Sequence, residues 1–123
     1  MLTAGAAGCG RSPAPPAGIL PGRAGGYERG EIEPIAADQA AEPLRRLGVA
    51  RLLRATYRGA GEIVLTAHEM TSEAGAFEAL QRRRPAPGSL AFQAGKLFLV
   101  AESEQAGHAE LQSFAAAVER ALR

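Results

Sequence analysis

The sequence has no tryptophan, one cysteine and a single lysine among its 123 residues. Because Cys9 stands alone, an internal disulfide and a zinc site built on cysteine ligands are both excluded. No apolar run approaches the roughly 20 residues that a membrane-spanning helix needs. The chain contains only four phenylalanines and two tyrosines. We therefore expect a core of small and aliphatic side chains.

The charges are nearly balanced, with 14 basic and 13 acidic side chains and a formal net charge of +1. A balance of this kind provides no overall field that would attract nucleic acid or an acidic membrane surface. Almost all of the basic residues are arginines, which we interpret as a compositional habit rather than a binding device. The predicted partners therefore include no nucleic acid.

The composition of residues 1–18 indicates an export signal followed by a tether. A run of small residues ends in Ala-Ala-Gly-Cys at Cys9, and a segment rich in proline, serine and glycine follows. This resembles the cleavage box of bacterial lipoproteins, although Ala6 stands where the box usually has leucine. The resemblance implies lipidation of Cys9, the only expected membrane contact. The alternative is a disordered N-terminus with a free cysteine. Residues 19–123 are predicted to form one domain.

The stretch 49–70 is predicted to form a central β-hairpin, with strands at 49–58 and 62–70 around a glycine-rich turn. In the first strand, apolar and polar side chains alternate. Val49, Leu53, Ala55 and Tyr57 share one face, and Arg54, Thr56 and Arg58 share the other. This alternation is typical of a strand that is buried on one face only.

A strand is expected at 27–35, where Pro34 restricts it to an edge or an end of the sheet. A short helix is expected at 38–48, capped by Asp38 and terminated by Gly48. Pro43 either kinks this helix or lies in its first turn, which would make the helix shorter.

The second half of the chain repeats the arrangement of a helix and a hairpin. A helix capped by Thr71 or Ser72 and ending near Arg84 is expected to bury Ala76, Phe77 and Leu80. Strands at 89–93 and 96–102 form the second hairpin, and the second strand is apolar on both faces. The last helix spans 107–123, with one apolar stripe: Leu111, Phe114, Val118 and Leu122.

The predicted order is therefore β-α-β-β-α-β-β-α. Hairpins make neighbouring strands antiparallel, so the predicted class is α+β, with about five strands built from two hairpins and covered by two or three helices.

Three segments, Asp38-Gln-Ala-Ala-Glu42, Arg51 to Tyr57, and Met70-Thr-Ser-Glu-Ala-Gly-Ala-Phe77, carry a family resemblance. Together they resemble the bacterial domain-of-unknown-function family numbered six-five-nine-nine. The resemblance covers about residues 19–122 and implies an exported protein or lipoprotein. It implies no activity.

The candidate ligand-binding residues are Asp38, Glu42, Tyr57 and His68. Asp38 and Glu42 are four residues apart and would share a helix face, as paired carboxylates do in acid/base sites, but Asp38 is also a natural cap. His68 suits a general base or a metal ligand, yet a lone histidine is more often an ordinary strand residue.

No phosphate-binding loop, nucleophile elbow or paired-histidine zinc motif occurs, so neither a catalytic set, a metal nor a cofactor is predicted. The leading hypothesis is a non-enzymatic lipoprotein of the cell envelope that binds an envelope protein or a small ligand. One alternative is a small hydrolase that uses His68 with Glu69 or Asp38. Another is a cytoplasmic domain that binds anions through its arginines.

Overall fold

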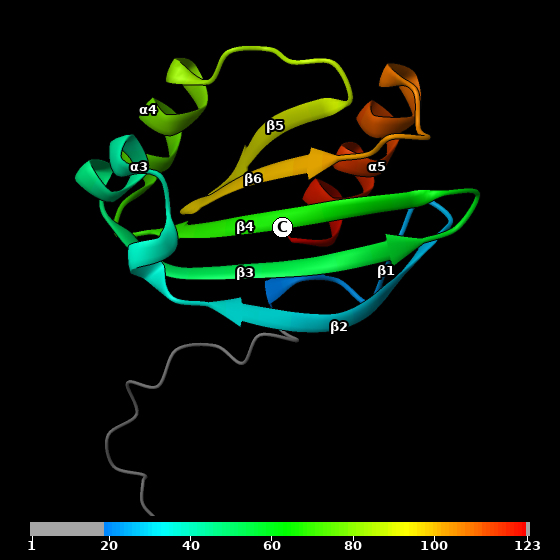
Figure 1. Ribbon diagram of the computed structural model, residues 1–123, viewed down its shortest axis with the longest axis horizontal. Helices are drawn as coiled ribbons and strands as arrows, with labels where there is room; N and C mark the ends of the chain where they lie inside the picture. Colours follow the sequence, from blue (N-terminus) through cyan, green and yellow to red (C-terminus); the bar gives the residue numbers. More distant parts are fainter. Residues whose placement is uncertain (1–18, 123) are drawn as a thin grey trace, which may run out of the picture.

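The computed structural model describes residues 19–122, which form an antiparallel six-stranded sheet and its helices. The elements are β1 (Arg23–Ala24), β2 (Tyr27–Ile35), the 3₁₀ turn η1 (Ala37–Gln39), α3 (Glu42–Leu47), β3 (Val49–Arg58), β4 (Glu62–Met70), α4 (Glu73–Arg82), β5 (Ser89–Ala94), β6 (Leu97–Glu102) and α5 (His108–Ala121). The strand order is β1-β2-β3-β4-β6-β5 (Figure 1). The predicted α+β class is confirmed. The predicted signal, tether and Cys9 lie outside the described residues.

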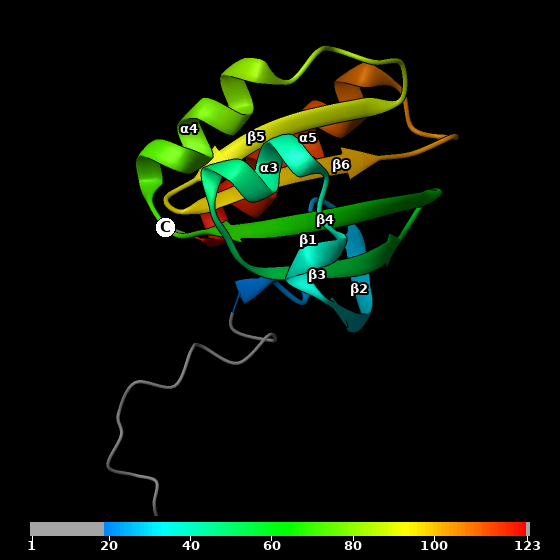
Figure 2. The same cartoon turned by 60° about the vertical axis from the view of Figure 1, so that its left-hand side comes forward.

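The helices cover the sheet from both sides. Helix α5 lies against one face, and α3 and α4 lie at one end of the other face (Figures 1 and 2). Within residues 19–122, none of the helices is long and apolar enough to span a membrane.

The main core lies between the sheet and α5, and aromatic rings occupy its centre. The ring of Phe114 on α5 meets those of Tyr57 and Tyr27 edge-on, at centroid distances of 5.0 and 5.7 Å. Leu111, Phe114 and Val118 are buried as the apolar stripe predicted. Edge-to-face contacts of this kind are favourable beyond the area that they bury, so they fix α5 on the sheet.

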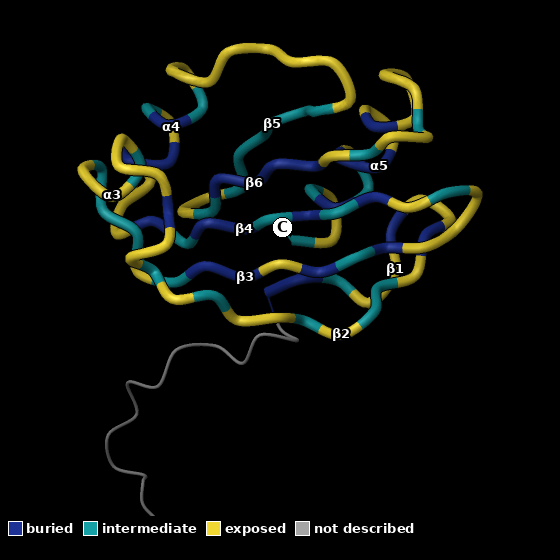
Figure 3. The backbone as a smooth tube through the Cα atoms, in the orientation of Figure 1, coloured by how far each residue is buried: buried dark blue, intermediate teal, exposed yellow. Residues whose placement is uncertain are grey.

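A smaller core lies under α4. Phe98 and Val100 of β6 pack there with Met70, Ala76 and Ala79, whereas Leu99 and Ala101 face the main core. The prediction that this strand is covered on both faces is confirmed. In Figure 3 β6 is buried along most of its length, while the loop that joins α4 to β5 is exposed.

The predicted helix 38–48 begins later than expected. Asp38 lies in η1, and α3 starts at Glu42 with Pro43 in its first turn, which agrees with the shorter of the two alternatives. No side chain caps α3, so the predicted capping role of Asp38 is wrong. Proline fits the first turn because the amide that it lacks has no partner there. Gly48 ends the helix at a φ of 95°.

The predicted buried stripe of α4 is wrong at Phe77, whose side chain is 52% exposed. The buried residues of this helix are Gly75, Ala76 and Ala79. A Cβ at Gly75 would lie 3.0 Å from the carbonyl oxygen of Leu47, so α3 and α4 approach closely. This approach requires small residues and turns Phe77 outward. The cap by Ser72 is confirmed, since its Oγ accepts a hydrogen bond from the Gly75 amide at 3.0 Å.

Two details of the strands also differ from the prediction. An irregularity between Val49 and Arg51 shifts the register of β3, and Val49 packs against the smaller core instead of joining Leu53. A bulge reverses the side chains on one side of it, which explains the error. The residues Arg23–Ala24 form a short additional strand, β1, which the predicted order of elements does not contain.

Candidate functional site

The predicted ligand-binding residues are not brought together. Asp38 is exposed on η1, and Glu42 is exposed at the start of α3, where its carboxylate pairs with Arg46 at 2.9 Å. Tyr57 and His68 lie on opposite faces of the sheet, since Tyr57 belongs to the main core and His68 packs against Phe98 of the smaller one. The four residues therefore do not form one site.

Tyr57 is a structural residue of the main core. Its ring is fully buried, and its hydroxyl donates a hydrogen bond to the carbonyl oxygen of Pro21 at 2.5 Å. Burial raises the pKa of Tyr57 to about 12, against a weaker opposing effect of Arg29. A buried phenol whose O–H already donates a hydrogen bond within the protein has no donor left for a ligand.

His68 is buried, and the charges that act on its ring belong to two arginines. Its side chain is 8% exposed, and its Nδ1 lies 3.1 Å from the carbonyl oxygen of Phe98, which can only accept a hydrogen bond. Nδ1 therefore carries the proton. Burial lowers the pKa of His68, the bond to Phe98 opposes this, and the positive charges of Arg83 and Arg54 lower it further. The structure thus holds His68 as a neutral imidazole.

Two carboxylates were proposed to assist His68; Asp38 is exposed on η1, and Glu69 does not face the histidine. Glu69 is the next residue of β4, and successive side chains of a strand point to opposite faces. Its carboxylate pairs instead with Arg51, at an Nε to oxygen distance of 3.1 Å. Among the described residues, no three histidine, aspartate or glutamate side chains cluster in a way that could hold a metal ion.

The structure reveals a hollow that the sequence did not indicate, with a volume of about 460 Å³. Its walls come from the end of α4, from the loop that follows, from the first half of β5 and from the first residue of α5. The lining residues are Leu80, Arg83, Arg84, Pro85, Ala86, Pro87, Ser89, Leu90, Ala91 and His108. We call this hollow the edge groove.

The edge groove lies across the free edge of β5 and not on one face of the sheet. Leu90 packs toward the main core and Ala91 toward the smaller core, yet both line the groove. Neighbouring strand residues point to opposite faces, so only a hollow at the edge can touch both. Strand β5 is the last strand in the sheet order, and no strand lies beyond it within residues 19–122.

The ionisable side chains that line the edge groove are all of the basic type. Arg83, Arg84 and His108 line it, and none of the described lining residues is acidic. The guanidinium of Arg83 donates a hydrogen bond to Ser89 Oγ at 2.8 Å, which fixes it beside the start of β5. The remaining walls are mostly aliphatic or proline. The groove thus combines an apolar interior with a basic rim.

A second hollow adjoins the first and has the opposite character. It has a volume of about 670 Å³, and Pro87 lines both hollows. Three carboxylates, those of Glu62, Glu102 and Glu104, line it together with Arg54. The loop between α4 and β5 therefore separates a basic hollow from an acidic one.

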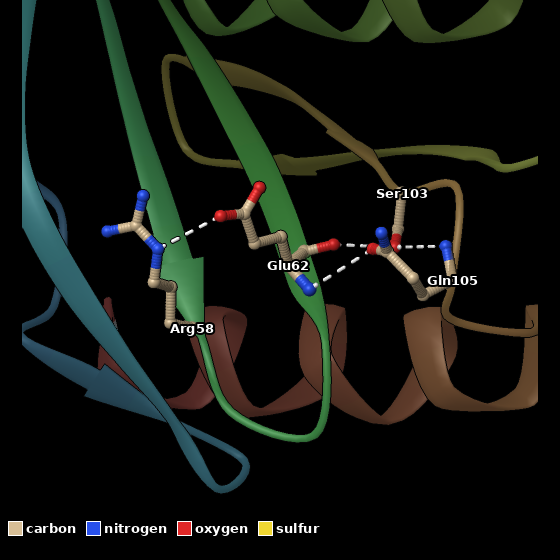
Figure 4. A network of polar contacts seen from close by, with 4 residues as sticks. All are labelled: Arg58, Glu62, Ser103 and Gln105. Carbon is tan, nitrogen blue, oxygen red and sulfur yellow. Dashed lines mark hydrogen bonds and ion pairs between the residues drawn. The ribbon is translucent and has the colours of Figure 1, made fainter.

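Hydrogen bonds hold this separating loop in place. The Ser103 amide donates to the carbonyl oxygen of Gly88 at 2.9 Å, and Gly88 has a φ of 70°. Ser103 Oγ in turn donates to the carbonyl oxygen of Glu62 at 2.6 Å and accepts from the Gln105 amide at 3.1 Å (Figure 4). Glu62 also pairs with Arg58 at 2.9 Å. The wall of the groove is thereby tied to β4 and to the start of α5.

No protein-family model, curated protein or solved structure matches the chain. The resemblance to the six-five-nine-nine family stays a prediction. What the domain does must be inferred from its own geometry.

Proposed function

We propose that the chain is a non-enzymatic binding domain of the bacterial cell envelope, anchored through Cys9, that binds its ligand in the edge groove. The observation that carries the binding role is the groove itself, which has mostly apolar walls, a rim of Arg83, Arg84 and His108, and no acidic side chain among the lining residues in the range 19–122. Binding sites are typically concave and mostly apolar, with a few polar groups that orient the ligand.

The chemistry of the groove defines a class of ligand. Two guanidinium groups favour a carboxylate or another anion, because they offer several N–H donors in a planar fork. Leu80 and Leu90 offer apolar contact beside them. The ligand that fits is therefore negatively charged at one end and apolar at the other.

The cell envelope enters the proposal through the N-terminal sequence. Support comes from the small residues before Cys9, from the proline-rich segment after it, and from the resemblance to a family of exported proteins. Localisation, anchoring and family membership are proposed on these grounds alone.

A role without catalysis is favoured by the surroundings of His68. The charges that act on its ring are arginines, and Glu69 is engaged with Arg51 on the other face of β4. A general base normally needs a carboxylate or a substrate group within hydrogen-bond reach. A purified domain that turned over a substrate, and lost this activity in His68→Gln, would refute the binding role.

The anchor is tested by the intact mass of the N-terminal peptide from membranes of the native host. We expect the peptide to begin at a diacylated Cys9. An unmodified Cys9 in the soluble fraction would refute the envelope proposal and leave the binding proposal to its own test.

The groove is tested by nuclear magnetic resonance titration with octanoate, which joins a carboxylate to an apolar chain, and with neutral octanamide as the control ligand. We expect octanoate to shift the amide signals of Leu80, Leu90 and Ala91 more strongly than octanamide. Arg83→Gln should weaken the response by about fivefold. Arg82→Gln is the matched control, because Arg82 pairs with Glu78 and does not line the groove. Equal responses to both ligands would refute the anionic specificity.

A further inference from the structure

We propose that the occupant of the edge groove is an extended peptide segment of a partner protein, which carries an acidic side chain and adds to β5 as a seventh strand. The inference rests on the proposed binding function of the groove and names the class of partner. Its basis is the direction in which the backbone of β5 points.

The hydrogen-bonding direction of β5 follows from its neighbours. The Met70 amide donates to the carbonyl oxygen of Lys96 at 2.8 Å, so the backbone of Lys96 faces β4. Backbone groups alternate in direction along a strand, so Leu97, Leu99 and Ala101 of β6 face β5. Their partners in the register are Ala94, Phe92 and Leu90.

The remaining residues of β5 must therefore direct their N–H and C=O groups away from the sheet. These are Ser89, Ala91 and Gln93. The chain itself confirms the first of them, since the Ser89 amide donates to the carbonyl oxygen of Ala86 at 3.2 Å. Ala86 and Ser89 form an isolated antiparallel bridge. Ala86 of the loop thus pairs with the outer side of β5 at Ser89, and this pairing does not continue along the rest of the strand.

The outward groups of Ala91 and Gln93 continue this ladder. An extended peptide can satisfy such groups with its own backbone, which is how strand addition provides affinity independently of side chains. The strand Ser89–Ala94 contains no charged residue and no proline, the two features that natural edges use to prevent pairing. The edge is therefore available to a partner.

The charge of the rim selects the kind of peptide. Arg83, Arg84 and His108 lie beside the start of β5, and Lys96 lies in the turn at its end. A second copy of this chain paired antiparallel along β5 would bring Arg83 and Arg84 close to another Lys96. Like charges in such positions oppose association, whereas an acidic peptide is attracted to both ends.

The test measures the affinity of the full chain for a capped six-residue peptide in which valine and glutamate alternate. Two N-methylated forms of the peptide are compared. Each form lacks the amide hydrogens along one edge of the extended peptide and keeps those along its other edge. Strand addition engages one edge only, so one form should bind at least about tenfold more weakly while the other binds like the parent peptide. Hydrogen exchange at the Ala91 and Gln93 amides should slow on binding, while exchange at Phe92 should not change.

The contribution of charge is read from the same peptide with glutamine in place of glutamate, and from the double variant Arg83→Gln/Arg84→Gln. Each should reduce affinity by about fivefold or more. Arg82→Gln should leave affinity unchanged.

Each other outcome overturns the proposal in a recognisable way. Equal effects of the two N-methylated forms would show binding without strand addition. Self-association of the chain without peptide, with protection at Ala91, would make a second copy the occupant. Binding of octanoate without binding of the peptide would leave the proposed function intact and refute this inference, and binding of neither would refute both.

Discussion

The two edges of the sheet are built differently. At the first edge, the two residues of β1 pair with the start of β2. The part of β2 that β1 does not cover contains Glu31, Glu33 and Pro34. It lies next to a register irregularity between Arg29 and Ile32. Charges, a proline and a bulge all oppose pairing with another strand. The second edge, β5, has none of these features, and within residues 19–122 the loop at Ala86 pairs with it only at Ser89. One edge is blocked by its own sequence, whereas the other is left open inside a groove.

The loops at the two edges provide the largest expected contrast. Gly88 before β5 and Gly26 before β2 both have positive φ values, 70° and 84°. A Cβ at Gly88 would lie 2.7 Å from the backbone oxygen of Ser103, whereas one at Gly26 would meet nothing within 4 Å. Gly88→Ala should lower the free energy of unfolding by about 3 kcal/mol, through conformational strain and a backbone clash. Gly26→Ala should cost about 1 kcal/mol.

Urea denaturation of both variants checks this contrast. Equal losses would mean that the loop beside β5 is no more tightly held than the turn at the first edge. In that case the groove would lack the fixed wall that the binding proposal requires.

The hydroxyl of Tyr57 ties the segment before β1 to β3, the strand that follows the first edge in the sheet order. Tyr57→Phe removes the hydrogen bond to Pro21 and keeps the ring contact with Phe114, so it should cost about 1 kcal/mol at pH 8. The pKa of about 12 in the folded state exceeds the unfolded value of 10.0. The neutral phenol therefore stabilises the fold below pH 10, and this contribution is lost as the pH rises toward 12. Urea denaturation from pH 8 to pH 12 should show the advantage of the native chain over the variant decreasing. An advantage that stayed constant would contradict the raised pKa.

His68 lies between the two edges and provides a smaller, pH-dependent effect. Its pKa in the folded state is below the unfolded value of 6.5, so the unfolded chain binds more protons in the window below 6.5. Stability should fall as the pH decreases through that window. His68→Gln should flatten the slope of unfolding free energy against pH between 7.5 and 5. A native slope in His68→Gln would contradict the assignment.

The sequence predicted well the parts of the fold that depend on local periodicity. The two hairpins and α5 follow from alternation and from the stripe of Leu111, Phe114 and Val118. Phe77 was misjudged because its exposure depends on how closely α4 approaches Leu47, which no local pattern records.

The edge groove escaped prediction for a related reason. Arg83 follows α4, Leu90 lies in β5 and His108 begins α5, so only the tertiary packing brings them together. The signal in the sequence was the arginine run at 82–84, followed by two prolines and an uncharged strand. This run does not predict a groove by itself, because nothing local identifies β5 as an edge.

The last prediction removes the protection of the first edge. The triple variant Glu31→Val/Glu33→Val/Pro34→Val removes the charges and the proline from the part of β2 that β1 does not cover. These positions are exposed, so the free energy of unfolding should change by less than about 0.5 kcal/mol per residue. The variant should nevertheless self-associate, detected as a concentration-dependent sedimentation coefficient, because an unprotected edge pairs with another copy. A variant that stays monomeric would mean that charges and proline do not protect β2. The absence of such residues from β5 would then no longer distinguish the two edges, and the case for strand addition would rest on the outward backbone groups of Ala91 and Gln93 alone.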